Sequence, residues 1–261
     1  MNNGFCNLAT IAFLVIKHGG KAIYEYSKGF SLEERSKNVY NFSKEAIERF
    51  KINMSVYGIE NLIRGPAILC PSHSSMVDMP AIVYCVPGRK YFGAKKEVFE
   101  IPILGAGLKS TGMPKIDRSN REQAIKSLNE AAEMITLESY GKRKENTAYL
   151  VIYPEGTRTR DRDYKLLPFK KGAFNLSINS GIPIIPVSSF GGIELMPKGE
   201  YKLPREEGRN YYMMVHHPIF PRKFLYGDVS EENKKRAVED ILVFTRLEIE
   251  KGIECLKNKC K

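Results

Sequence analysis

Cysteine is scarce in this sequence and is not arranged for disulfides or metal binding. The chain has five cysteines, an odd number, and no two are spaced as C-x-x-C. Such a scattered set is typical of incidental thiols in a reducing compartment rather than of a disulfide framework or a zinc site. The adjacent His216 and His217 have no nearby cysteine or acidic cluster. We therefore predict a structural or surface role for both histidines, no metal and no cofactor.

Long apolar runs are also missing. Residues 5–16 are uncharged and mostly apolar, but this stretch of about twelve residues is shorter than the ~20 needed to cross a bilayer as a helix. A secretory signal fits poorly, because the first four residues carry no basic side chain and no clean cleavage site follows. We expect neither a spanning helix nor a signal peptide.

The residues after this run combine cations with apolar and aromatic side chains. Lys17, His18, Lys21 and Lys28 lie among tyrosines and apolar residues. This mixture suits a helix in the membrane interface whose lysines reach lipid phosphates, although a helix packed on the domain core shows a similar pattern. The two interpretations are compatible if they apply to different faces of the helix.

A second N-terminal helix is predicted from a capping box. Ser31 is followed three residues later by Glu34, and apolar residues recur at helical spacing up to about Phe50. Together the two helices indicate that residues 1–50 form a helical module at the membrane interface. The remainder, residues 51–261, is long enough for one domain with a large core.

Beyond residue 50, strand patterns alternate with helix patterns. The predicted strands cover residues 52–57, 67–70, 90–94, 148–153, 184–188 and 211–216. The predicted helices cover residues 76–84, 121–138, 173–179 and 231–256. Asn120 and Ser230 are suitable N-caps, and Gly181 is a suitable C-cap. This alternation predicts a single α/β domain in which helices flank a central mixed β-sheet.

Basic residues outnumber acidic ones. The sequence has 41 Lys and Arg against 30 Asp and Glu, a net charge of +11. A positive surface attracts nucleic acid, anionic lipid headgroups, the phosphates of coenzyme A or an acidic carrier protein. Because the sequence has no helix-turn-helix, zinc-finger or aromatic RNA-binding signature, we expect no nucleic-acid partner.

A histidine and an aspartate follow the predicted strand at residues 67–70. His73 and Asp78 lie in the segment Ser-His-Ser-Ser-Met-Val-Asp, where that strand ends in a loop. An aspartate that accepts the imidazole N–H fixes the tautomer and leaves the other nitrogen free to take a proton from an alcohol or thiol. The pair is a candidate general base, and a structural or surface histidine is the alternative.

A candidate phosphate site follows the predicted strand at residues 148–153. Pro154 stops the strand, and Glu155, Gly156, Thr157 and Arg158 come next. Arginine offers a planar fork of donors, and glycine lets backbone N–H groups approach an anion closely. This composition favours a phosphate, whereas a solvated basic loop is the alternative.

Taken in this order, the two segments resemble the glycerolipid acyltransferase family. The first of four matching blocks runs from His73 to Asp78. The second block consists of residues 95–102, Gly105, Gly112 and residues 116–118. The third block is residues 153–158, and the fourth is residues 182–187. The resemblance covers about residues 52–190. Ser72 is one departure, because many members carry asparagine at that position.

The resemblance implies transfer of an acyl group from acyl-CoA or an acyl-carrier-protein thioester to the sn-2 hydroxyl of lysophosphatidic acid. His73 would act as the general base and Asp78 would hold its imidazole. A thioester is already activated, so no serine or cysteine nucleophile is needed, and the sequence has no G-x-S-x-G elbow. Ser74 and Ser75 are therefore interpreted as loop or helix-cap residues.

The resemblance also implies the residues that hold the acceptor. Lys95, Arg118 and Arg158 would face its phosphate, and Gly156 and Thr157 would shape the loop. Two roles stay open for Glu155, which either orients Arg158 or bonds the glycerol. Seven apolar residues are candidates for the lining of an acyl groove: Phe92, Val98, Phe99, Ile101, Ile103, Leu104 and Leu108. A place in the ordinary hydrophobic core explains each of them equally well.

Two alternatives to this function remain from the sequence. The first is acyl transfer to another lysophospholipid, glycerol 3-phosphate or a lyso-aminolipid. The second is a non-catalytic lipid-binding protein of the membrane surface, which the complete set of His73, Asp78, Glu155 and Arg158 disfavours. Whichever lipid it accepts, we expect the protein at the cytoplasmic face of the cell membrane, as a peripheral or monotopic protein bound to an anionic surface.

Overall fold

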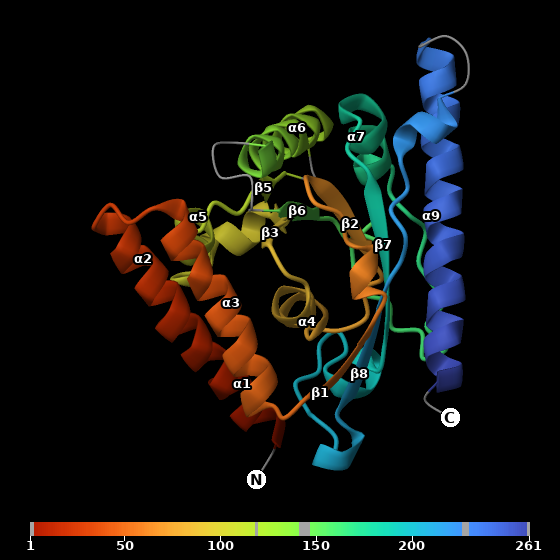
Figure 1. Ribbon diagram of the computed structural model, residues 1–261. Helices are drawn as coiled ribbons and strands as arrows, with labels where there is room; N and C mark the ends of the chain where they lie inside the picture. Colours follow the sequence, from red (N-terminus) through yellow and green to blue (C-terminus); the bar gives the residue numbers. More distant parts are fainter. Residues whose placement is uncertain (1–2, 118–119, 141–146, 226–229, 260–261) are drawn as a thin grey trace.

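A six-stranded mixed sheet forms the centre of the molecule (Figure 1). The computed structural model describes residues 3–117, 120–140, 147–225 and 230–259. The strand order is β1 (Asn53–Tyr57), β8 (Asn210–Val215), β7 (Ile184–Phe190), β2 (Ala67–Pro71), β6 (Ala148–Val151) and β3 (Arg89–Phe92). Neighbouring strands are parallel except β7 and β8, which are antiparallel. The predicted mixed sheet is confirmed, and each predicted strand has a counterpart.

One predicted strand is divided between two sheets. The sequence pattern at residues 90–94 predicted a single strand, but β3 ends at Phe92 and the chain leaves the main sheet at Gly93. It then forms a separate two-stranded sheet from β4 (Ala94–Lys95) and β5 (Lys115–Ile116). This turn away from the main sheet carries Lys95 out of the core and leaves it exposed.

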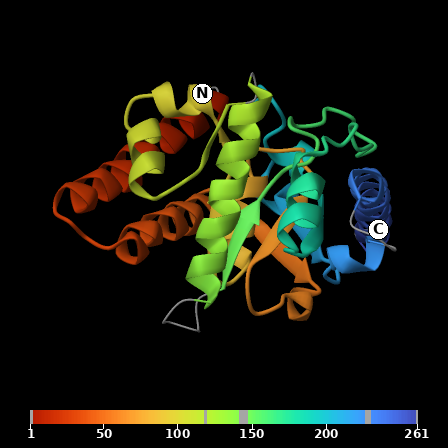
Figure 2. The same cartoon turned by 90° about the horizontal axis from the view of Figure 1, so that it is seen from above.

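Helices cover both faces of the sheet, as predicted. On one side lie α6 (Arg121–Tyr140), α7 (Gly172–Ser180) and α9 (Glu231–Lys259), which runs along β7 (Figures 1 and 2). On the other side lies α4 (Asp78–Cys85), with α3 (Leu32–Arg49) packed against it. The sequence did not predict the short elements α5 (Leu104–Ser110), α8 (Gly192–Leu195) and four 3-10 turns at Ile59–Asn61, Lys96–Glu100, Glu206–Gly208 and Pro221–Phe224.

The predicted helix caps are confirmed. Ser31 and Glu34 form the complete capping box at the start of α3. Asn120 Oδ1 accepts the Gln123 N–H at 3.1 Å, and Ser230 Oγ accepts the Asn233 N–H at 3.3 Å. Gly181 ends α7 with φ of +75°, a left-handed conformation that favours glycine. These ends were predictable because a cap satisfies backbone groups within one turn of the chain.

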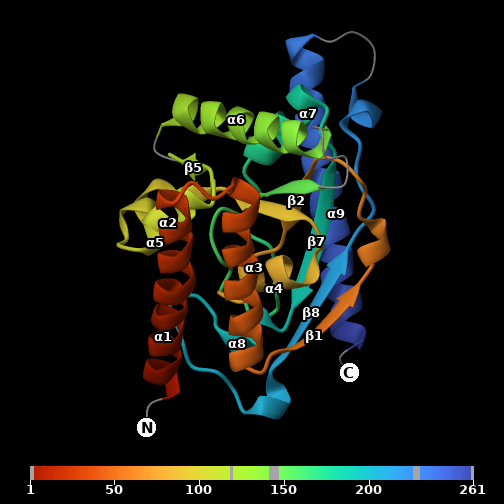
Figure 3. The same ribbon diagram turned by 60° about the vertical axis from the view of Figure 1, so that its left-hand side comes forward.

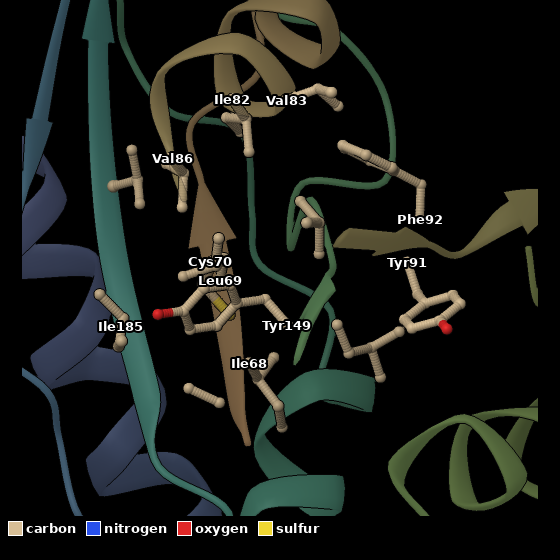
Figure 4. Packing of buried hydrophobic residues seen from close by; sticks show 14 of the residues in the cluster. Ile68, Leu69, Cys70, Ile82, Val83, Val86, Tyr91, Phe92, Tyr149 and Ile185 are labelled. Atoms are coloured by element: carbon tan, nitrogen blue, oxygen red, sulfur yellow. The ribbon is translucent and has the colours of Figure 1, made fainter. Parts of the chain in front are cut away.

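The core lies around the central strands β2, β6 and β7. Ile68, Leu69 and Cys70 of β2 are completely buried, as is Ile185 of β7, and they belong to the same hydrophobic cluster as Ile82 and Val83 of α4 (Figure 4). Parallel strands with helices on both faces bury both sets of side chains, which explains their continuous apolar sequence. Each fully buried aliphatic side chain stabilises the fold by about 1.5–3 kcal/mol.

The N-terminal helices pack on this domain rather than standing apart from it. The first helical segment consists of α1 (Asn3–Leu14), a π-helical stretch at Val15–Gly19 and α2 (Gly20–Ser27), and it lies beside α3 (Figure 3). Leu14, Ala46 and Ile47 from these helices belong to the hydrophobic core. The opposite face exposes Phe5, Ile16 and other large apolar side chains.

No helix in the described part of the chain has the length and apolar character required to span a bilayer.

Candidate active site

His73 and Asp78 form a hydrogen-bonded pair beyond the end of β2. The His73 Nδ1–H donates to Asp78 Oδ2 at 2.8 Å. Asp78 is the first residue of α4, and its side chain is 1% exposed, whereas that of His73 is 21% exposed. The carboxylate therefore fixes the imidazole tautomer, and the Nε2 atom is left as the basic nitrogen.

Three further donors hold the Asp78 carboxylate. The backbone N–H groups of Ser74 and Ser75 donate to Oδ2 at 2.7 and 2.8 Å, and Tyr211 Oη donates to Oδ1 at 2.9 Å. Such a set of donors stabilises the ionised form of a buried carboxylate. The two serines act here through the loop backbone, in agreement with their predicted loop role.

Tyr211 is a site residue that the sequence did not reveal. It lies on β8, 133 positions from Asp78 along the chain. Burial, reinforced by the charge of Asp78, raises the pKa of Tyr211 well above its usual range, so its hydroxyl remains a donor. In the sequence, Tyr211 stands in the continuous apolar run of residues 211–215 and has no signal that distinguishes it from a core tyrosine.

The ring of His73 is also held from one side by Tyr153. The two rings stack with centroids 3.9 Å apart and an interplanar angle of 23°. Tyr153 comes from the loop that follows β6, so the predicted phosphate loop and the histidine loop are in direct contact.

Glu155 joins the same two loops through their backbones. Its side chain is buried, and its Oε1 and Oε2 accept the N–H groups of His73 and Leu167, each at 2.8 Å. Burial raises the pKa of Glu155 to about 7, although both N–H donors oppose that shift, and the charge of Asp78 adds to it. These contacts favour a structural role, different from the two roles that the sequence left open.

The predicted phosphate residues meet His73 at one cavity of about 700 Å³. Its lining includes His73, Lys95, Gly156, Thr157 and Arg158. Gly156 has φ of +71°, which favours glycine and turns the loop back toward His73. The structure therefore brings together residues from three separate sequence blocks. Arg118, the other predicted phosphate ligand, lies outside the described residues.

Arg158, which lines this cavity, has an unsatisfied side-chain donor. Its Nη1 is buried and has no hydrogen-bond partner within the described parts of the chain. An unpaired buried guanidinium nitrogen costs free energy unless an anion or water pairs with it. The planar donor fork matches the oxygens of a phosphate.

Comparison with known proteins places the chain in a family. A family model described as Acyltransferase matches residues 53–189, which contain His73, Asp78 and the loop at 153–158. The chain belongs to this acyltransferase family. The match ends before β8, so Tyr211 lies outside it.

Individual relatives of this acyltransferase are named for one activity. A 1-acyl-sn-glycerol-3-phosphate acyltransferase from Saccharomyces cerevisiae is 36% identical over 136 residues, covering 52% of this chain and 42% of the relative. One from Haemophilus influenzae is 38% identical over 121 residues, covering 46% of each chain. The matched region thus spans about half the length of these curated relatives.

A solved structure resembles nearly the whole acyltransferase. The crystal structure of the 1-acyl-sn-glycerophosphate (LPA) acyltransferase PlsC from Thermotoga maritima has a TM-score of 0.68 and 25% sequence identity. The alignment covers 97% of this chain and 94% of that one. The similarity therefore extends beyond the matched family region to both terminal parts of the fold.

Apart from its charged lining residues, the cavity is mainly apolar. Five of the seven predicted groove residues line it, namely Phe92, Val98, Ile101, Leu104 and Leu108, whereas Phe99 and Ile103 are not in its lining. The N-terminal helices contribute much of the remaining wall, including Ile11, Leu14, Val39, Phe42, Ala46 and Ile47. The sequence did not predict this contribution, because a helix that lines a cavity and one that packs on a core have the same apolar pattern.

Other polar clusters are structural. His216 is largely buried beside Ser188, with Nε2 2.8 Å from Ser188 Oγ, and burial lowers its pKa to about 4. The four cysteines within the described residues are free. Among those same residues, no group of three or more His, Cys, Asp or Glu side chains is arranged to hold a metal ion.

Proposed function

We propose that this acyltransferase moves a fatty acyl group from an acyl-CoA or acyl-carrier-protein thioester to the sn-2 hydroxyl of lysophosphatidic acid, giving phosphatidic acid. The observation that carries this proposal is one cavity that combines the His73–Asp78 pair, the unpaired Arg158 nitrogen and long apolar walls. An acceptor with a hydroxyl, a phosphate and an acyl chain matches these three features. The names of the relatives support the same choice.

In this mechanism, His73 Nε2 takes the proton of the acceptor hydroxyl while the oxygen attacks the thioester carbonyl. A positioned general base contributes about 10²- to 10⁴-fold to the rate. Asp78 stabilises the imidazolium that forms. When the tetrahedral intermediate breaks its C–S bond, the imidazolium returns the proton to the leaving thiolate, so His73 is regenerated and no acyl-enzyme forms.

The charged and apolar parts of the cavity then have separate tasks. Arg158 and Lys95 bind the phosphate and orient the glycerol toward His73, which lowers the entropic cost of reaching the attack geometry. The apolar lining from α1, α3 and α5 takes an acyl chain. Glu155 keeps the histidine loop and the arginine loop in register.

The N-terminal helices extend this proposal to the membrane. Phe5, Ile16, Tyr24 and Lys21 on these helices are exposed. Aromatic and aliphatic side chains beside lysines are typical of a helix in the interface of an anionic bilayer. We propose peripheral or monotopic attachment at the cytoplasmic face, with the cavity wall next to the lipid that supplies the acceptor.

The test is an assay of purified protein in mixed micelles with long-chain acyl-CoA or acyl-carrier protein, followed by mass spectrometry of the lipid product. We expect phosphatidic acid from lysophosphatidic acid, and a loss of about 10²- to 10⁴-fold in His73→Ala. The exposed His217 provides the matched control, His217→Ala, with unchanged rate. Parallel reactions with lysophosphatidylcholine, glycerol 3-phosphate and a lyso-aminolipid identify another acceptor if phosphatidic acid is absent. Equal turnover by His73→Ala would reject the general-base role.

A further inference from the structure

Lys198 brings a cation to the cavity from outside the matched family region. It follows α8, and the family match ends at residue 189. Its Nζ donates to Thr157 Oγ1 at 2.9 Å, and it lines the same cavity as His73, Lys95 and Arg158. An ammonium group has three donors, so the bond to Thr157 leaves two for another partner.

The backbone next to Lys198 is fixed to the catalytic loop. The carbonyl of Met196 accepts the Ser75 hydroxyl at 2.9 Å and the Met76 N–H at 3.0 Å. Pro197 forms an isolated antiparallel bridge with Ser75. The segment that carries Lys198 is therefore held by the same loop that carries His73 and Asp78.

The charges that line the cavity are unbalanced. Lys95, Arg158 and Lys198 line it, and no aspartate or glutamate does so among the described residues. The buried Arg158 Nη1 lacks a partner within that part of the chain. A phosphate monoester carries about −1.5 to −2 charges at neutral pH and three acceptor oxygens, which suits several cations better than one.

We propose that Lys198 is a direct ligand of the acceptor phosphate and makes acceptor choice depend on that phosphate. This inference rests on the proposed function and assigns a binding residue beyond the family region. Lys198, Lys95 and Arg158 come from three different connections of the fold, so they approach the anion from separate segments. The Thr157 hydroxyl holds the ammonium in place before the acceptor enters.

The experiment compares Lys198→Gln, Lys198→Arg and a matched control, Lys202→Gln. Lys202 is exposed on the same segment and does not line the cavity. KM and kcat are measured with lysophosphatidic acid and with a monoacylglycerol, which lacks the phosphate. For Lys198→Gln we expect KM for lysophosphatidic acid to rise about 10-fold or more with little change for monoacylglycerol, as for a lost charge-assisted hydrogen bond. Lys198→Arg should restore much of the loss, and Lys202→Gln should behave like the wild type.

Two results would overturn the inference. Equal losses for both acceptors would show that Lys198 only supports the Thr157 loop, and unchanged KM would show that it does not touch the phosphate. Calorimetric titration with lysophosphatidic acid separates this inference from the proposed function. If the wild type forms no phosphatidic acid, weaker binding by Lys198→Gln than by Lys202→Gln still supports the phosphate contact, and equal binding rejects it.

Discussion

The catalytic loops (residues 72–78 and 153–159) and the helical wall (α1, α2, α3 and α5) enclose the same cavity but are built differently. In the catalytic loops, the Asp78 and Glu155 carboxylates accept hydrogen bonds from specific donors, whereas three buried atoms, Ser74 Oγ, Tyr153 Oη and Arg158 Nη1, have no partner among the described residues. The helical wall contacts the cavity through apolar side chains spread over many turns. Hydrogen bonding demands specific residue types, whereas apolar lining demands only suitable volume.

From this difference we predict where substitutions in each region should act. Under the proposed mechanism, a substitution at His73 or Asp78 alters the geometry of proton transfer, so it should lower kcat for every acyl donor. A substitution in the helical wall alters the volume or the membrane contact, so it should change chain preference or lipid binding. The following predictions test that separation.

Asp78→Asn should give the largest effect in the catalytic loops. The amide can no longer stabilise the imidazolium, and an amide in this position favours the wrong imidazole tautomer, so kcat should fall by about 10³- to 10⁴-fold. Acyl-CoA donors of different length should show the same loss. Single-turnover assays measure it, and circular dichroism checks the fold. A loss that varied with donor length would contradict the separation of the two regions.

Glu155→Gln should change how stability depends on pH. Since the folded-state pKa of Glu155 is raised from 4.5 to about 7, the folded state binds more protons than the unfolded state between these values. The contribution of Glu155 to the free energy of unfolding is therefore greatest below about pH 4.5 and falls, by up to about 3 kcal/mol, as pH rises to about 7. Glutamine cannot titrate. As pH rises over that window, the free energy of unfolding of the wild type should therefore fall relative to that of Glu155→Gln.

Urea unfolding at pH 5 and pH 8 measures this difference. Glu97→Gln is the matched control, because Glu97 is exposed on the surface. Parallel pH profiles for the wild type and Glu155→Gln would show that Glu155 has no raised pKa in the folded protein.

Ile16→Glu should weaken membrane binding without affecting the catalytic loops. The Ile16 residue is 57% exposed on the outer face of the first helical segment. Moving such a side chain into the interface contributes about 1.5–3 kcal/mol, so its loss and the added negative charge should weaken binding to anionic vesicles by about 10- to 100-fold. Vesicle sedimentation measures binding, and activity in detergent micelles should be retained.

Leu137→Glu is the control for that substitution. Leu137 is 74% exposed but lies on α6, away from the N-terminal helices. If both variants lost vesicle binding equally, the interface would not be confined to the N-terminal helices.

Leu108→Phe should have the smallest effect. Leu108 lies on α5 and lines the cavity, so the larger ring removes space for an acyl chain. We expect kcat/KM for the longest acyl donors to fall by about 10-fold relative to shorter ones, the discrimination that one or two methylene groups provide. Competition between acyl-CoA donors of different length measures the ratio. An equal loss for all donors would place Leu108 outside the acyl path.

Much of the fold followed from local patterns. The apolar run at residues 67–70, the capping box at Ser31 and the left-handed Gly181 each depend on neighbours within a few residues, and the structure agrees with all three. The break after β3 was not predictable, because the residues after Gly93, Ala94 and Lys95, pair with β5, which lies beyond α5 in the sequence. Short helices such as α5 lack the length that makes a periodic signal visible.

Much of the candidate site was likewise visible in the sequence. His73, Asp78 and Arg158 stand in short segments whose composition indicates chemistry, and they meet in the structure. Glu155 stood in the same segment, but its role depends on the backbone N–H groups of His73 and Leu167, which lie on either side of it in space.

By itself the sequence determined the local elements, the excess of positive charge and the His-Asp and arginine segments, because hydrophobic periodicity, caps and residue chemistry act over a few neighbouring positions. Only the tertiary structure decided that Tyr211 supports Asp78, that Lys198 faces the cavity and that the N-terminal helices form its wall. Those contacts depend on strand order and helix packing, which join residues that are far apart in the sequence, 41 positions for Lys198 and Thr157 and 133 for Tyr211 and Asp78, and leave no periodic mark in either segment.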